Sequence, residues 1–112
     1  MSEAQVLKHY KMTILKTDGT EEPIEQNFYP NLDQLHKLID CDLVERVRLN
    51  LIIDGEPVQK DMLVDESGLY STKLYNDAAT KLYRETAFNN TGRESGAMII
   101  GNAVFFENFN LR

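Results

Sequence analysis

The residues that could do chemistry in this chain are few and far apart. His9 and His36 are the only histidines, and the only cysteine, Cys41, lies between two aspartates. A zinc site needs about four ligands at characteristic spacings, which these residues do not supply. Neighbouring carboxylates raise the pKa of a thiol and disfavour the reactive thiolate, so Cys41 is predicted to be structural.

No combination of residues indicates catalysis. The chain has no G-x-S-x-G sequence and no paired Cys–His context. Acidic residues are numerous, but Asp18 and Asp54 stand beside glycine, where they are predicted to form turns. The chain is therefore predicted not to be an enzyme, with no catalytic residue, no metal site and no cofactor.

The stretch LYNDAATKLY, residues 74–83, holds the best candidates for ligand binding. Asn76 is predicted to cap the N-terminus of a helix, an end that also attracts anions. Thr80 is disfavoured inside a helix and could bond back to a carbonyl or face Asn102. Arg93 lies in the loop GRESG, which lacks the lysine of a P-loop and is more simply a connection. Asn76, Thr80, Arg93 and Asn102 are the predicted ligand-binding residues.

The C-terminal sequence FFENFNLR indicates a second surface. It continues past the predicted end of the last strand, so Phe109 and Leu111 are the apolar residues expected to be most exposed. Together with Phe106 they are predicted to form a partner surface; the alternative is that most of the aromatic rings fill a small core. Exposed apolar groups of this kind favour a protein partner or a homodimer contact.

The order of elements is predicted to be β-β-α-β-β-α-β. Two strands flank the TDGT turn, and Pro23 places the second of them at a sheet edge. Asn31 is predicted to cap a short amphipathic helix, and residues 43–54 alternate as a half-buried strand with a shorter partner. A helix from about 76 to 85, a loop at 86–96 and a central strand interrupted by Gly101 follow. We expect an α+β fold, with one mostly antiparallel sheet and two helices packed on one face.

Length and composition predict one acidic domain. A flexible tail at 1–8 and a single domain at 9–112 account for the 112 residues. The net charge of −6 argues against nucleic-acid binding. No signal peptide and no membrane-spanning run are recognised, so a cytoplasmic location is expected.

Three segments resemble a small domain family of unknown function that is common in phages and mobile elements. They are LIIDGEP at 51–57, MLVDESGLYSTKLYNDAATKLY at 62–83 and MIIGNAVFFEN at 98–108. The similarity covers most of residues 11–107, although the first hairpin and helix match only in type. The matching residues are Val64, Asp65, Glu66, Gly68, Asn76, Ala79, Thr80, Leu82, Ile100, Gly101, Asn102 and Val104. The chain departs from the family in its longer loop at 86–96. The resemblance implies a phage or mobile-element origin and a shared fold, and it brings no activity.

Two functions are expected from these observations. The first is a non-enzymatic phage accessory protein that binds a host or phage protein in the cytoplasm of the host cell. The alternative is a protein that binds a small ligand, with nucleotides as candidates, through the helix N-terminus near Asn76 and the 86–96 loop.

Overall fold

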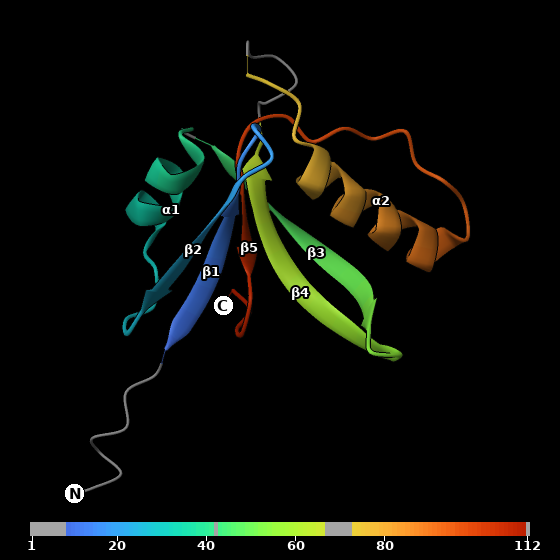
Figure 1. Cartoon of the computed structure of the whole chain (residues 1–112), viewed down its shortest axis with the longest axis horizontal. Coiled ribbons are helices and arrows are strands. Elements are labelled where there is room, and N and C mark those ends of the chain that lie inside the picture. The colour runs from blue at the N-terminus through green and yellow to red at the C-terminus, as the bar shows by residue number, and fades with distance from the viewer. Residues whose placement is uncertain (1–8, 42, 67–72, 112) are drawn as a thin grey trace, which may run out of the picture.

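The computed structural model describes residues 9–41, 43–66 and 73–111 (Figure 1). The tail predicted at 1–8 and the family residue Gly68 lie outside these ranges. The elements in chain order are β1 (Tyr10–Leu15), β2 (Glu21–Gln26), α1 (Leu32–Ile39), β3 (Val44–Ile53), β4 (Glu56–Asp65), α2 (Asp77–Thr91) and β5 (Ala103–Phe106). The predicted element order and the α+β fold are confirmed.

The five strands form one antiparallel sheet in the order β2-β1-β5-β4-β3. The last strand of the chain is thus the central strand of the sheet, as predicted. Pro23 lies in the edge strand β2, where its missing N–H interrupts no inner ladder. Asp54 and Gly55 form the two-residue turn between β3 and β4, and both have positive φ.

The two helices cover opposite faces of the sheet, which corrects the prediction that both pack on one face. One core cluster joins Ala79 of α2 to Met62 and Val64 of β4. A second cluster joins Leu35 of α1 to Leu63 of the same strand. Successive side chains of a strand point to opposite faces, so these clusters lie on opposite sides of β4. Strands that are apolar on both faces need cover on both, and Figure 1 shows the helices well apart beside the two halves of the sheet.

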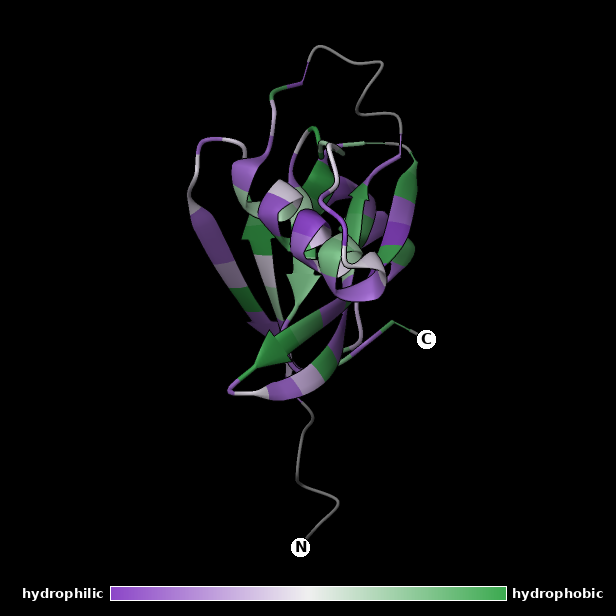
Figure 2. Cartoon of the chain, turned by 90° about the vertical axis from the view of Figure 1, so that its right-hand side faces the viewer, coloured by the Kyte–Doolittle hydropathy of each residue, from purple (hydrophilic) through white to green (hydrophobic). Residues whose placement is uncertain are grey.

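Both predicted helix starts are confirmed, but α2 is longer than predicted. Asn31 caps α1 by accepting a hydrogen bond from the N–H of Gln34. The helix predicted to end near residue 85 continues to Thr91 and ends at Gly92, which adopts the left-handed conformation. The predicted 86–96 loop therefore begins only at Gly92. In Figure 2 the strands beneath α2 contain green apolar segments, while the turns of the helix are mostly purple or pale.

Asparagine side chains complete the hydrogen bonding around the short central strand. Beyond β5, the chain turns and the segment 107–111 runs between β1 and β4. Asn108 bonds the N–H of Lys11 and the carbonyl of His9. Asn110 accepts from the N–H of Asp61, at 3.1 Å, and its amide nitrogen lies 3.4 Å from the carbonyl oxygen of Gln59. The side-chain amides of Asn108 and Asn110 thus hydrogen-bond backbone groups of β1 and β4 that lie beyond the end of β5.

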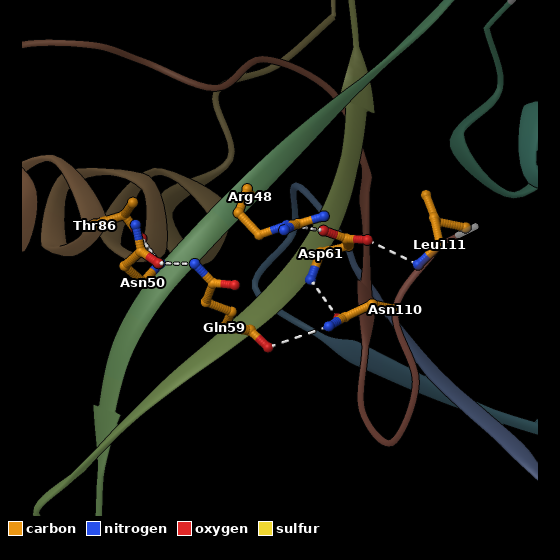
Figure 3. Close-up of polar contacts among 7 residues, drawn as sticks. All are labelled: Arg48, Asn50, Gln59, Asp61, Thr86, Asn110 and Leu111. Carbon is orange, nitrogen blue, oxygen red and sulfur yellow. Dashed lines mark hydrogen bonds and ion pairs between the residues drawn. The ribbon is translucent and has the colours of Figure 1, made fainter.

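Asp61 is the buried anchor of this C-terminal segment. Its side chain has no exposed surface, and Oδ1 accepts from Nε of Arg48 at 2.8 Å. The other oxygen, Oδ2, accepts from the N–H of Leu111 at 2.7 Å. Figure 3 shows these contacts continuing through Gln59 and Asn50 to Thr86 of α2. One chain of polar contacts therefore joins the C-terminal segment to the far side of the sheet.

We expect Asp61→Asn to destabilise the protein by about 1–3 kcal/mol, because an amide nitrogen would face either Arg48 or the N–H of Leu111. Urea unfolding monitored by circular dichroism measures this change. Asp54→Asn is the matched control: Asp54 is exposed, asparagine tolerates its positive φ, and a change within about 0.5 kcal/mol is expected. Equal stability of the two variants would show that Asp61 does not anchor the segment.

Candidate functional site

Asn76, the first predicted ligand residue, is fully buried and satisfies three backbone groups. Its Oδ1 accepts from the N–H of Ala79 at 3.1 Å, as an N-cap does. Its amide nitrogen donates to the carbonyls of Leu15 and Gly101, at 2.8 and 2.9 Å. Both amide hydrogens are used, so Asn76 fastens α2 to the end of β1 and to the turn before β5.

Thr80 and Asn102 also bond to backbone rather than to each other. The buried hydroxyl of Thr80 accepts from the N–H of Ile99 at 2.9 Å. This bond accounts for a threonine in the second turn of a helix. Oδ1 of Asn102 accepts from the N–H of Thr17 at 3.2 Å.

The four predicted ligand residues do not meet in one pocket. Asn76 precedes α2, whereas Arg93 follows Gly92 at its other end, and a helix of this length spans about 22 Å. Arg93 is exposed. Asn102 lines a separate recess of about 210 Å³, with Thr17, Ile39, Asp40, Lys73, Leu74 and Gly101.

The charge in this recess is already paired. Nζ of Lys73 lies 2.6 Å from Oδ2 of the buried Asp65 and also donates to the carbonyl of Asp40. Burial lowers the pKa of Lys73, but the hydrogen bond and charge of Asp65, with the charges of Cys41 and Asp40, outweigh it. The pKa of Lys73 therefore lies above its ordinary value of 10.5. Its contribution to stability is complete at neutral pH and is lost only as the pH rises through that raised value.

The predicted C-terminal partner surface is mostly interior, which corrects the expectation for these residues. Phe106 is fully buried in the core beneath α1. Phe109 is half-buried and makes edge-on contacts with Tyr10, Tyr29 and Phe106, with ring centroids 5.0–5.7 Å apart. Leu111 packs on the same cluster. The bonds of Asn108, Asn110 and Asp61 turn this segment inward, and no periodicity in the sequence predicted them.

A different surface, the free edge of β3, has backbone polar groups that no described residue hydrogen-bonds. Because the turn holds two residues, Ile53 and Glu56 form the first hydrogen-bonded pair of the β3–β4 hairpin. The backbone groups of residues 45, 47, 49, 51 and 53 therefore point toward β4. Those of residues 44, 46, 48, 50 and 52 point away from the sheet.

Helix α2 blocks this edge at one residue, Asn50. The N–H of Asn50 donates to Oγ1 of Thr86 at 3.0 Å, and its carbonyl accepts from the side chain of Asn89 at 2.7 Å. Its side chain also donates to Oδ1 of Asn90. These contacts satisfy the backbone N–H and carbonyl of Asn50. They also confirm that these two groups point away from β4, as the register of the hairpin predicts.

Beside this point the edge remains open and faces a groove. Within the described residues, the outward backbone groups of Arg46 and Arg48 form no hydrogen bond. The groove has a volume of about 380 Å³. We call it the β3–α2 groove; its walls are residues 45–48 of β3 and, from α2, Tyr83, Thr86, Ala87, Asn90 and Thr91. The helical residues are spaced as one face of a helix, so the groove is a channel between a strand edge and a helix wall.

The sequence did not predict this groove, because the predicted end of α2, near residue 85, falls before most of the residues that form the helix wall. Residues 86–91 supply most of the helix wall, and they had been predicted as loop. A signal was available: Gly92 is the first glycine after Asn76, and glycine is the usual residue just past a helix end. Asn89 and Asn90 are typical of loops, but in the structure both side chains hydrogen-bond to Asn50.

No group of three or more potential metal ligands occurs in the part of the chain that the structure describes. Over the same residues, neither helix is long and apolar enough to cross a membrane. Comparison of the chain with protein-family models, curated proteins and solved structures finds no match.

We expect Asn76→Asp to destabilise the protein by about 2–4 kcal/mol, although aspartate is an equally good N-cap. The new carboxylate would face the carbonyls of Leu15 and Gly101 and leave both unsatisfied. Asn31→Asp is the matched control, because Asn31 is exposed and, within the described part of the chain, its side chain accepts a hydrogen bond and donates none. Chemical denaturation compares the two, and similar small losses would contradict the assigned role.

Hydrogen exchange measured by NMR tests the β3 edge directly. We expect a protected amide at Asn50 and rapidly exchanging amides at Arg46 and Arg48 in the free protein. Thr86→Val removes the acceptor at nearly constant volume and should raise exchange at Asn50 by about tenfold or more, which corresponds to one lost hydrogen bond. Protection of Arg46 equal to that of Asn50 would mean that the edge is not open.

Proposed function

We propose that this chain is a non-enzymatic protein-binding domain that receives an extended segment of another protein in the β3–α2 groove. The segment adds to the sheet as a strand beside β3. The single observation that carries the proposal is the unsatisfied backbone of Arg46 and Arg48 facing a groove with a helix as its other wall. Strand addition beside a helix is a general mode of peptide recognition.

The contrast with the other edge supports a functional role for β3. An open strand edge invites unwanted pairing, and proteins protect such edges with proline and charge. Strand β2 has both: it contains Pro23, and the acidic side chains of Glu21, Glu22 and Glu25 are exposed. Strand β3 also carries exposed charges, at Glu45, Arg46 and Arg48, but it is longer and has no proline. Its described contacts occupy the outward backbone groups only at Asn50.

Pairing of β3 with a second copy of itself is disfavoured. An antiparallel pair centred on Val47 would set Arg46 directly opposite Arg48 of the other copy, and like charges in that position repel. The wall formed by α2 also obstructs the approach of a second sheet. A single extended segment meets neither obstacle.

The setting of this function is part of the proposal. The resemblance to a phage and mobile-element domain supports a host or phage protein as partner, in the cytoplasm of the host cell. Binding alone would inhibit or redirect such a partner. The nucleotide-binding alternative loses its support, because Asn76 and Thr80 are committed to backbone and Arg93 lies at the other end of α2.

The test uses a displayed library of random linear peptides selected on the full chain. Arg46→Pro removes the arginine side chain and one outward backbone N–H, at an edge position that tolerates proline. Arg46→Ala keeps this N–H and removes the same charge. We expect selected peptides to bind Arg46→Ala and to lose at least tenfold affinity for Arg46→Pro, which follows from lost backbone bonds and obstructed pairing.

A calorimetric or anisotropy titration of each purified peptide measures this difference. Spectra and melting curves of both variants must match those of the original chain. Equal affinity for the proline and alanine variants, or a selection that enriches no peptide over an unrelated domain, would contradict binding at this edge.

A further inference from the structure

The alternation of side chains along β3 determines what a bound segment must present on each of its faces. Arg48 bonds to Asp61, and Arg46 shares its face because the two are separated by one residue. Val47 points the other way and packs with the core beneath α2. Residues of an added strand that lie opposite these positions share their faces.

The face of Arg46 and Arg48 is locally positive, although the whole chain carries a net charge of −6. Arg46 is exposed, its neighbour on β4 is the apolar Leu63, and its side chain has no ion pair among the described residues. Arg48 donates a hydrogen bond from Nε to Asp61, and about 45% of its side chain remains exposed. Its terminal guanidinium N–H groups can therefore serve a second carboxylate.

The opposite face of the groove favours a different residue. A side chain opposite Val47 points toward α2, where Tyr83 and the small Ala87 line the wall. Both of these residues are half-buried, and Tyr83 packs against the core cluster. An apolar side chain of moderate size removes this surface from water. The next position on that face lies opposite Glu45, which repels an acid.

Asn50 sets where the bound segment ends. Its N–H and carbonyl are occupied by Thr86 and Asn89, so a strand added along β3 finds no backbone partner there. Pairing is confined to the short stretch around residues 45–48, which is also the stretch that lines the groove. Because the pairing stretch is short and ends at Asn50, the bound segment can pair with β3 in only one register.

On the basis of the proposed function, we infer that the groove is selective for an extended segment with the pattern acidic–apolar–acidic. The two acids lie opposite Arg46 and Arg48, and the apolar residue between them points into the β3–α2 groove. The position opposite Glu45 is not acidic. The partner is thus identified by its chemistry as a protein with an exposed acidic strand or tail.

The experiment selects a displayed library with five randomised positions between serine and threonine flanks, using the full chain and Arg46→Glu in parallel. For the original chain we expect acids two positions apart with an apolar residue between them. For Arg46→Glu we expect lysine or arginine to replace the acid opposite position 46. Representative peptides should change their preference by about fivefold, as single exposed charge pairs do, and less at high salt.

The outcomes separate this inference from the proposed function. Peptides that are weakened by Arg46→Pro but show no acidic preference, or keep it in Arg46→Glu, overturn the charge pattern and leave strand addition in place. Peptides indifferent to Arg46→Pro, or a selection that enriches nothing, overturn both. Arg46 is exposed in an edge strand, so Arg46→Glu should fold normally, which its melting curve checks.

Discussion

The short length of β5 is the constraint on which the rest of this structure depends. The strand has four residues, yet it lies between β1, with six, and β4, with ten. The inner edges of both neighbours therefore extend beyond it and need other hydrogen-bond partners. Asn108 and Asn110 supply them past the end of β5, and Asn76 and Asn102 supply them before its start. Four amide side chains thus complete a sheet whose central strand is incomplete.

This arrangement positions α2 and, through it, the groove. Asn76 holds the start of the helix against the end of β1, and Thr80 holds it against Ile99. From that fixed start, a helix of fifteen residues reaches past the core to the edge of β3. Its last turns satisfy Asn50 and leave the edge at Arg46 and Arg48 open. The groove is therefore a consequence of where α2 begins and how far it continues.

Local signals were sufficient for much of the fold. The Asp-Gly turns, Pro23 and the two asparagine caps act over a few residues, and each is confirmed at its predicted place. Predictions failed where the deciding partner is distant in sequence. Thr86, Asn89 and Asn90 were predicted as loop because their contacts with Asn50 lie about 40 residues away. Phe109 was predicted to be exposed because the bonds that turn the C-terminal segment inward come from β1 and β4.

The sequence alone determined the class of fold, the order of its elements, the edge position of β2 and the central position of the last strand. It did so because turn residues, caps and alternation act locally. Only the tertiary structure decided that the helices cover opposite faces, that Asn76 and Thr80 serve the backbone, and that β3 keeps an open edge beside α2. These features depend on which backbone groups still lack hydrogen-bond partners once the strands have assembled. The partners are distant in sequence, so local sequence patterns do not reveal them.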